Sequence, residues 1–173
     1  PDLHVLVLSC DVCNSEPDER LWQEIADEEK AVRETVKLEQ INKWLPIQAT
    51  RQAYKRLGKD PNRYRPSSEA LRRRILRELP LYKVDTLVDL INLVSIRSGY
   101  SIGGFDADKI AGGSLVLGVG REGEIYHGIG RGELNIAGLP VYRDAVGGVG
   151  TPTSDEERTK IGLDTTHLLM IIN

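Results

Sequence analysis

Three polar side chains interrupt an otherwise apolar segment near the middle of the chain. Asp89, Asn92 and Ser95 are each three residues apart, and this spacing places them on one side of a helix. Burying such groups without hydrogen-bond partners costs roughly 1–3 kcal/mol each, so the row must face either backbone groups or a wet pocket. Two interpretations stay open: the row is a set of satisfied structural groups, or it is one wall of a ligand pocket.

The helix that carries this row is expected to begin near Thr86, a residue type that caps first turns. It is expected to end near Gly99, because glycine suits the left-handed conformation that follows many helices. Apolar residues cover most of its circumference between positions 84 and 96, which predicts a core helix. Gly103 and Gly104 follow, and glycines at such positions let the backbone approach a ligand closely.

Two further patterns carry weaker functional signals. Cys10 and Cys13 follow an expected strand, as in a redox-active dithiol or half of a zinc site, but two packed, reduced thiols explain them as well. Residues 118–123 match GxGxxG, yet turn residues follow where a dinucleotide site requires a helix. The three histidines are scattered and indicate no acid–base pair by spacing. We therefore expect no metal and no cofactor.

The segment from Arg51 to Arg77 is the strongest partner signal. It contains ten Lys or Arg residues against two acidic ones, whereas residues 11–39 contain ten acidic residues against four basic ones. Arginines interleaved with tyrosines can neutralise phosphates and stack on bases, which favours RNA. The candidate RNA contacts are Arg63, Tyr64, Arg65, Arg72, Arg73 and Arg74. The alternative also stays open: these arginines pair with the acidic segment or form a solvated face.

Composition narrows the class of protein. A length of 173 residues, a net charge of −3 and 40% hydrophobic residues are typical of a soluble protein with one domain. No segment approaches the roughly 20 apolar residues of a membrane span. No signal peptide opens the sequence and two cysteines give no disulfide framework, so we expect a cytoplasmic protein. Neither a membrane nor DNA is expected as a partner.

Helical and strand patterns are segregated along the chain. Residues 3–9 are aliphatic and predict a buried strand, and helical patterns then follow up to residue 98. Twelve of the seventeen glycines lie between Gly112 and Gly150, where they alternate with short apolar runs, and residues 168–172 predict a last buried strand. This order predicts an α+β fold, with N-terminal helices packed on a mostly antiparallel sheet or sandwich of short strands.

Several segments resemble a known family. Residues 84–92 (VDTLVDLIN) and 105–110 (FDADKI) resemble the tRNA-editing domain of the phenylalanyl-tRNA synthetase beta chain. Residues 65–73 (RPSSEALRR) are more similar to free-standing relatives of that domain. Residues 144–159 resemble its glycine-rich turn and threonine, so that the similarity covers residues 51–173.

The resemblance implies an organisation and an activity. Residues 1–173 would form a single domain, with an N-terminal strand–helix part (1–50) and an editing-domain-like core (51–173). The chain would hydrolyse mischarged aminoacyl-tRNA in trans without a metal, and tRNA or aminoacyl-tRNA is the expected partner. It would not charge tRNA, because the rest of the synthetase is not present in the sequence.

The resemblance also implies a pocket between the middle helix and the glycine-rich strands. Its substrate-binding residues would be Asp89, Asn92, Ser95, Gly103, Gly104, Gly147, Gly148 and Thr159. The synthetase domain has a histidine where this chain has Gly103 and a glutamate where it has Ile171, so no catalytic residue is assigned. The first alternative function is therefore a non-catalytic module that binds tRNA or an amino acid. A redox protein that uses Cys10 and Cys13 is a second alternative.

Overall fold

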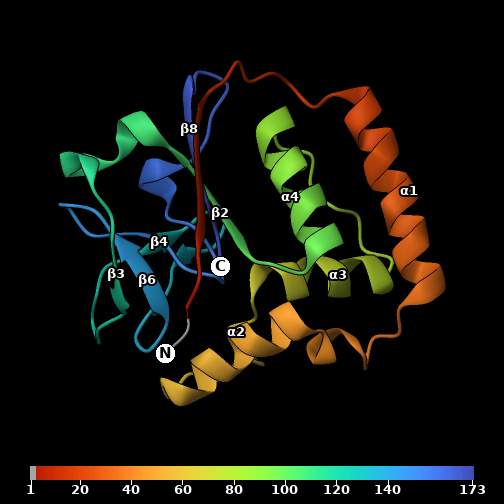
Figure 1. Cartoon of the computed structure of the whole chain (residues 1–173), viewed down its shortest axis with the longest axis horizontal. Helices are drawn as coiled ribbons and strands as arrows, with labels where there is room; N and C mark the ends of the chain where they lie inside the picture. Colours follow the sequence, from red (N-terminus) through yellow and green to blue (C-terminus); the bar gives the residue numbers. More distant parts are fainter. Residues whose placement is uncertain (1–2) are drawn as a thin grey trace.

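The computed structural model describes residues 3–173, and its helices and strands occupy different parts of the molecule (Figure 1). Within these residues the helices are α1 (Glu19–Thr35), α2 (Leu45–Arg56), α3 (Ser67–Leu76) and α4 (Thr86–Ser98), with 3-10 turns η1 (Ile41–Lys43), η2 (Ala107–Lys109), η3 (Ala111–Gly113) and η4 (Glu157–Thr159). The strands are β1 (Leu6–Asp11), β2 (Ile102–Asp106), β3 (Val116–Val119), β4 (His127–Gly128), β5 (Gly132–Glu133), β6 (Pro140–Arg143), β7 (Gly148–Gly150) and β8 (His167–Ile172). The α+β fold expected from the sequence is confirmed. No helix of the described chain is both long and apolar enough to cross a membrane.

The last strand is the centre of the first sheet. β8 lies between β1 and β2, and both neighbours run antiparallel to it. Leu6 of β1 pairs with Ile172, and Gly103 of β2 pairs with Ile171. Leu168 and Ile171 are buried, as expected for this strand. The sheet therefore joins residues from the two ends of the described chain.

The first strand is exposed, so the expectation of a buried strand at this position is wrong. Leu6, Val7 and Leu8 keep 55%, 53% and 41% of their surface exposed. β1 forms one edge of the sheet, and solvent reaches side chains on both of its faces. An aliphatic pattern predicts a strand but does not show which of its faces will be covered.

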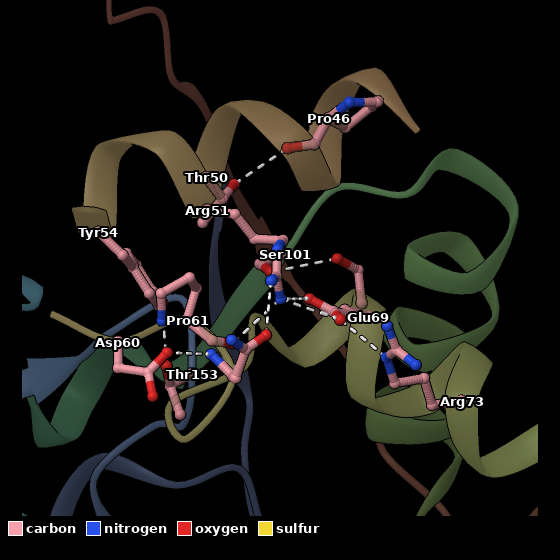
Figure 2. A network of polar contacts seen from close by, with 12 residues as sticks. Pro46, Thr50, Arg51, Tyr54, Asp60, Pro61, Glu69, Arg73, Ser101 and Thr153 are labelled. Atoms are coloured by element: carbon pink, nitrogen blue, oxygen red, sulfur yellow. Dashed lines mark hydrogen bonds and ion pairs between the residues drawn. The ribbon is translucent and has the colours of Figure 1, made fainter. Parts of the chain in front are cut away.

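The second sheet and α2 share one buried cluster. β6 lies between β3 and β7, and β4 and β5 form a separate hairpin. Tyr54 of α2 is fully buried against Tyr126, Leu139 and Val141. Its hydroxyl lies 2.9 Å from that of Thr153, which precedes η4 (Figure 2). This cluster fixes the helices to the glycine-rich half of the chain.

Helix α4 is bounded by an aspartate and a glycine. The carboxylate of Asp85, rather than the hydroxyl of Thr86, accepts the N–H of Val88 at 2.9 Å, so the expected cap is off by one residue. Gly99 ends the helix at φ 80°, as its type predicts. A Cβ at Gly99 would lie 2.6 Å from the ring of Trp44, so glycine is required for packing as well.

Helix α4 is only partly a core helix. Ile91, Leu93 and Ile96 are buried, because α1, α3 and β2 pack around that side of the helix. Leu90 and Val94 remain 45% and 41% exposed. The apolar pattern thus extends further around the helix than its burial does.

A buried ion-pair network joins α2 to α3 (Figure 2). The side chain of Glu69 is fully buried, and its carboxylate accepts Arg51 Nη1 at 2.8 Å and Arg73 Nε at 2.7 Å. Arg51 also donates to the carbonyl of Pro61 at 3.1 Å and to Asn62 Oδ1 at 2.7 Å. The buried carboxylate of Glu69, compensated by the two arginines, therefore holds α2, α3 and the loop between them together.

Replacing Glu69 by alanine should reduce the free energy of unfolding by about 3–5 kcal/mol, because Arg51 would remain buried without a counter-charge. Chemical denaturation measures this change, and Glu39→Ala at an exposed acidic position is the matched control. A loss of less than about 1 kcal/mol, as surface ion pairs give, would show that the network does not hold the two helices together.

Candidate functional site

The predicted polar row on α4 is only partly a pocket wall. Asp89 and Asn92 line a cavity of about 100 Å³ that also contacts Trp22 and Arg74. Ser95 is turned away from it and donates a hydrogen bond to the carbonyl of Tyr100 at 2.6 Å. Ser95 is therefore satisfied by a backbone carbonyl, whereas Asp89 and Asn92 face a hollow between α4, α1 and α3.

The predicted glycines lie elsewhere and do not border this cavity. A side chain on Gly103 would place its Cβ 2.7 Å from Phe105 Cζ and 3.4 Å from Asp155 Oδ1. A Cβ on Gly104 would lie 2.7 Å from Ile91 Cδ1. The space above these glycines is thus filled by the protein itself, and the structure does not combine them with the α4 row into one pocket.

The later glycines support a turn rather than the α4 cavity. Gly147 donates its N–H to Asp144 Oδ1 at 3.0 Å, and Asp144 also accepts two bonds from Arg158, at 2.8 and 3.0 Å. Hydrogen bonds from Arg158 and from the backbone hold the pKa of Asp144 below its ordinary value despite burial. Gly148 lies against the ring of Tyr126.

The predicted Thr159 is fully buried at the end of η4. Its hydroxyl finds no hydrogen-bond partner among residues 3–173. An unsatisfied buried hydroxyl costs roughly 1–3 kcal/mol, and such groups concentrate at sites where a ligand or water completes the bonding. Thr159 directly follows Arg158, which borders the second hollow of the molecule.

This second hollow is an open cleft of about 520 Å³ between the β4–β5 hairpin and η4. Its lining is composed of glycines and charged residues: His127, Gly128, Gly130, Gly132, Glu156, Glu157 and Arg158. The volume falls within the roughly 300–1,000 Å³ of small-molecule sites. It is the larger of the two hollows, and it lies within the glycine-rich half of the chain.

An imidazole and a carboxylate meet in this cleft. His127 Nδ1 lies 4.0 Å from Glu156 Oε1, and the other oxygen of Glu156 accepts the N–H of Arg158 at 2.6 Å. The histidine side chain is 56% exposed, whereas the glutamate side chain is only 11% exposed. The two groups are too far apart for a hydrogen bond, so they resemble a histidine base and its orienting carboxylate only in type and position and would have to approach by about 1 Å to act as one.

Asp155 is turned the opposite way from Glu156. Its carboxylate accepts the N–H of Gly104 at 3.2 Å, and its own carbonyl accepts the N–H of Ile129 in the hairpin. Burial raises the pKa of Asp155 to about 7, and the bond from Gly104 offsets only part of that effect. A carboxyl group that titrates near neutrality therefore lies behind the cleft.

The sequence pattern did not identify His127, Asp155 or Glu156. They come from two turns about 28 residues apart, and the isolated bridge between Gly128 and Glu156 brings them together.

The basic segment divides into buried and exposed arginines. Arg72 is buried, donates to the carbonyl of Ile96 and stacks over Trp44 at 3.5 Å. Arg73 is paired with Glu69, as described above. Arg72 acts inside the fold and Arg73 is partly covered by its ion pair, so the structure offers less support for RNA contacts at these two residues than at exposed arginines.

The other predicted RNA contacts lie nearer to solvent. Arg63 is exposed with its guanidinium 5.6 Å from the ring of Tyr64, and Arg65 is partly exposed in the same loop. Arg74 stacks over Tyr82 at 4.2 Å. The N–H of Ser67 donates to the carbonyl of Pro152 at 2.8 Å, which ties this loop to the segment that leads to Glu156. Arg63, Tyr64, Arg65 and Arg74 therefore remain RNA-binding predictions.

Both cysteines are exposed, so the expectation of packed thiols is wrong. Both thiols are free in the described chain, and neither takes part in a disulfide.

Two other site types have no counterpart in the described part of the chain. No helix opens after Gly123 in residues 3–173, which disfavours a dinucleotide site at the GxGxxG pattern. No group of three or more His, Cys, Asp and Glu side chains in that range is gathered closely enough to hold a metal ion.

Comparison with known proteins places most of the chain in one family. Residues 49–173 match the family model of the B3/4 domain. The search of curated proteins finds no match. The matched part begins within α2 and contains the whole cleft, whereas β1 and α1 precede it.

Replacing Asp155 by asparagine should stabilise the protein at pH 8 by roughly 4 kcal/mol and change its stability little at pH 4. The pKa of Asp155 is about 7 in the folded chain against an ordinary 3.8, so the folded state keeps a proton that the unfolded state loses. The contribution of Asp155 to the free energy of unfolding therefore falls as the pH rises from about 4 to 7. Denaturant midpoints at both pH values measure the effect, with Asp27→Asn as the exposed control. An equal change at both pH values would contradict the assignment.

Proposed function

The chain belongs to the B3/4 domain family, the domain found in the phenylalanyl-tRNA synthetase beta chain, and on that premise we propose that it hydrolyses mischarged aminoacyl-tRNA in trans. The family links the chain to tRNA-associated proteins. The observation that supports hydrolysis is the cleft in which His127 and Glu156 lie 4.0 Å apart.

The chemistry would be an ester hydrolysis carried by the side chains of the cleft. His127 accepts a proton from a water molecule, and the water oxygen attacks the carbonyl carbon of the aminoacyl ester. The ester C–O bond then breaks, and the ribose hydroxyl leaves with the proton that His127 returns. Glu156 would orient the imidazole, a role that requires the 4.0 Å distance between the two groups to shorten when substrate is bound.

The loop of residues 59–66 would guide the nucleic acid. Arg63 and Arg65 supply charge for phosphates, and Tyr64 supplies a ring edge beside them. The bond between Ser67 and Pro152 keeps this loop next to the segment that carries Glu156. A tRNA held by the loop would thus bring its aminoacylated end toward the cleft.

Binding without turnover is the second candidate function. In the related synthetase domain, the resemblance places a histidine at Gly103 and a glutamate at Ile171. Here these two residues are direct cross-strand partners, and the ring of Phe105 occupies the space over Gly103. The position of the family's polar pair is therefore filled by the ring of Phe105, with the buried carboxyl of Asp155 as the polar group beside it, and the lack of the family's histidine and glutamate favours a module that only holds tRNA.

Deacylation of a panel of mischarged tRNAs by the purified protein distinguishes these functions. We expect acceleration over buffer for at least one of them, and a loss of roughly 10²–10⁴-fold for His127→Ala, because the general base is removed. Glu156→Gln should also slow the reaction. His4→Ala, an exposed histidine outside the cleft, is the matched control. Saturable tRNA binding without any acceleration would favour the binding module instead.

The loop predicts a salt-sensitive contribution to tRNA affinity. Replacing Arg63 and Arg65 together by alanine should weaken tRNA binding and reduce the slope of log K against log salt by about 1–2, because two phosphate contacts are lost. Filter binding over a salt series measures both quantities. A double replacement of the exposed Lys30 and Lys37 controls for the change in net charge. An unchanged slope in the loop variant would remove this surface from the proposal.

A further inference from the structure

The first strand forms an open edge of the central sheet. Among residues 3–173, β1 is paired with β8 on one side, and none of the isolated bridges in that range involves it. The ladder between the two strands runs over all six residues of β1 without a register shift. β1 therefore presents a regular edge with no strand of the described chain beside it.

Alternate backbone groups along this strand point away from the sheet. The N–H of Val12 donates to the carbonyl of Thr166 at 2.9 Å, in the same register as the β1–β8 ladder. Antiparallel strands alternate between hydrogen-bonded and non-hydrogen-bonded pairs, so the even-numbered residues of β1 bond to β8. The odd-numbered residues Val5, Val7 and Ser9 then turn their N–H and C=O groups outward.

The opposite side of β8 gives the same alternation. The N–H of Asn173 donates to the carbonyl of Ser101 at 3.2 Å, in the register of the β2–β8 ladder. The odd-numbered residues of β8 therefore bond to β2, and its even-numbered residues are left to bond to β1. The even-numbered residues of β1 lie opposite these, as in the pair of Leu8 with Met170. Both sides of β8 thus assign the same outward groups to β1.

This edge lacks the features that keep sheet edges from pairing. Natural edge strands are protected by lysines, prolines, bulges or a covering segment. Residues 3–11 contain no Lys, Arg or Pro, and their one carboxylate, Asp11, is at the end of the strand. The aliphatic side chains of residues 5–8 are all exposed. An unprotected aliphatic edge of this kind is suited to the addition of another strand.

The strand is complementary to its own copy. Residues 5–9 read Val-Leu-Val-Leu-Ser, which is nearly the same in both directions about Val7. A two-fold axis through an antiparallel pair places residues of equal parity opposite each other, so Val7 can lie opposite Val7. Leu6 of each copy then lies opposite Leu8 of the other, and the two Asp11 carboxylates lie at opposite ends of the ladder, where they do not repel.

We propose that this chain forms a two-fold homodimer in which β1 pairs antiparallel with β1 of a second copy, centred on Val7. The two three-stranded sheets then form one continuous sheet. Pairs of Val5 with Ser9 and of Val7 with Val7 supply about six backbone hydrogen bonds, within the roughly 5–15 of a typical interface. The contact is at the small end of interface sizes, so we expect a dissociation constant on the order of 1–100 µM.

Sedimentation velocity of the full chain tests the dimer. The mass should rise from that of one chain to that of two over concentrations from roughly 1 to 500 µM. Over the same range the amide protons of Val5, Val7 and Ser9 should become protected from hydrogen exchange. Those of Leu6 and Leu8 should be protected at every concentration, because they bond to β8.

Substitutions at Val7 separate the outward groups from the rest of the strand. Val7→Pro removes an outward N–H that β8 does not use, and Val7→Lys places a charge opposite its own copy. Each should weaken association by roughly tenfold or more, with circular dichroism unchanged. Val7→Thr keeps the N–H and the branched shape and should still dimerise. Val146→Lys, at an exposed valine outside β1, controls for the added charge.

A cysteine near the two-fold axis tests the register. In a Cys10→Ser, Cys13→Ser background, Val7→Cys should form an intermolecular disulfide under mild oxidation, because Cα atoms opposite each other lie about 5.5 Å apart and disulfides span roughly 4.4–6.8 Å. Val5→Cys should not, because the two copies of this residue are offset by about 14 Å along the strands.

A chain that stays monomeric over the whole concentration range would overturn the proposal. So would a dimer that Val7→Pro and Val7→Lys both leave unchanged, or one that is cross-linked through Val5→Cys and not through Val7→Cys. A monomer that takes a foreign aliphatic peptide onto β1 would assign the edge to another protein and would also overturn it. Deacylation assays measure the cleft and sedimentation measures this edge, so failure of one is distinguishable from failure of the other.

Discussion

The fold is organised around a carboxylate that water does not reach. The charge of Glu69 is stable inside the protein only because Arg51 and Arg73 compensate it, and these partners come from both sides of a loop. Arg72 is also directed inward, where it donates to the carbonyl of Ile96 near the C-terminal end of α4. A segment that is strongly basic in sequence is therefore only partly basic at the surface, where its exposed members are Lys55, Arg56, Arg63 and Arg77.

The molecule separates two kinds of polar chemistry. The cleft is open, lined by glycines, and lies entirely within the part that matches the B3/4 domain. The cavity under α1 is smaller and is lined mainly by aliphatic side chains around Asp89. The volume of the cleft is about five times that of the cavity. Buried β2 residues lie between these regions, where Gly104 contacts both Ile91 of α4 and the carboxylate of Asp155.

The sequence predicted the family, the α+β class and the position of α4, because these depend on local patterns and on a resemblance over many residues. It left open whether Asp89 and Asn92 are satisfied structural groups or one wall of a pocket, and the resemblance placed that pocket against the glycine-rich strands, whereas the hollow beside these residues is enclosed by α1, α3 and α4. The sequence did not show which residues far apart in the chain pair with one another. Strand pairing sets Gly103 opposite Ile171, an isolated bridge sets His127 beside Glu156, and neither distance in sequence has a local signature. The exposure of β1 likewise depends on whether another layer covers it.

The pairing of β1 with β8 has a kinetic consequence. Leu6 and Ile172 are 166 positions apart, so the chain must close a very long loop before this ladder gains its hydrogen bonds. The helices, whose contacts are local, can form on a much faster timescale. Refolding should therefore pass through a stage in which the helical half is formed while the central sheet is still open, and the rate of the last step is set by topology rather than by the strength of the finished contacts.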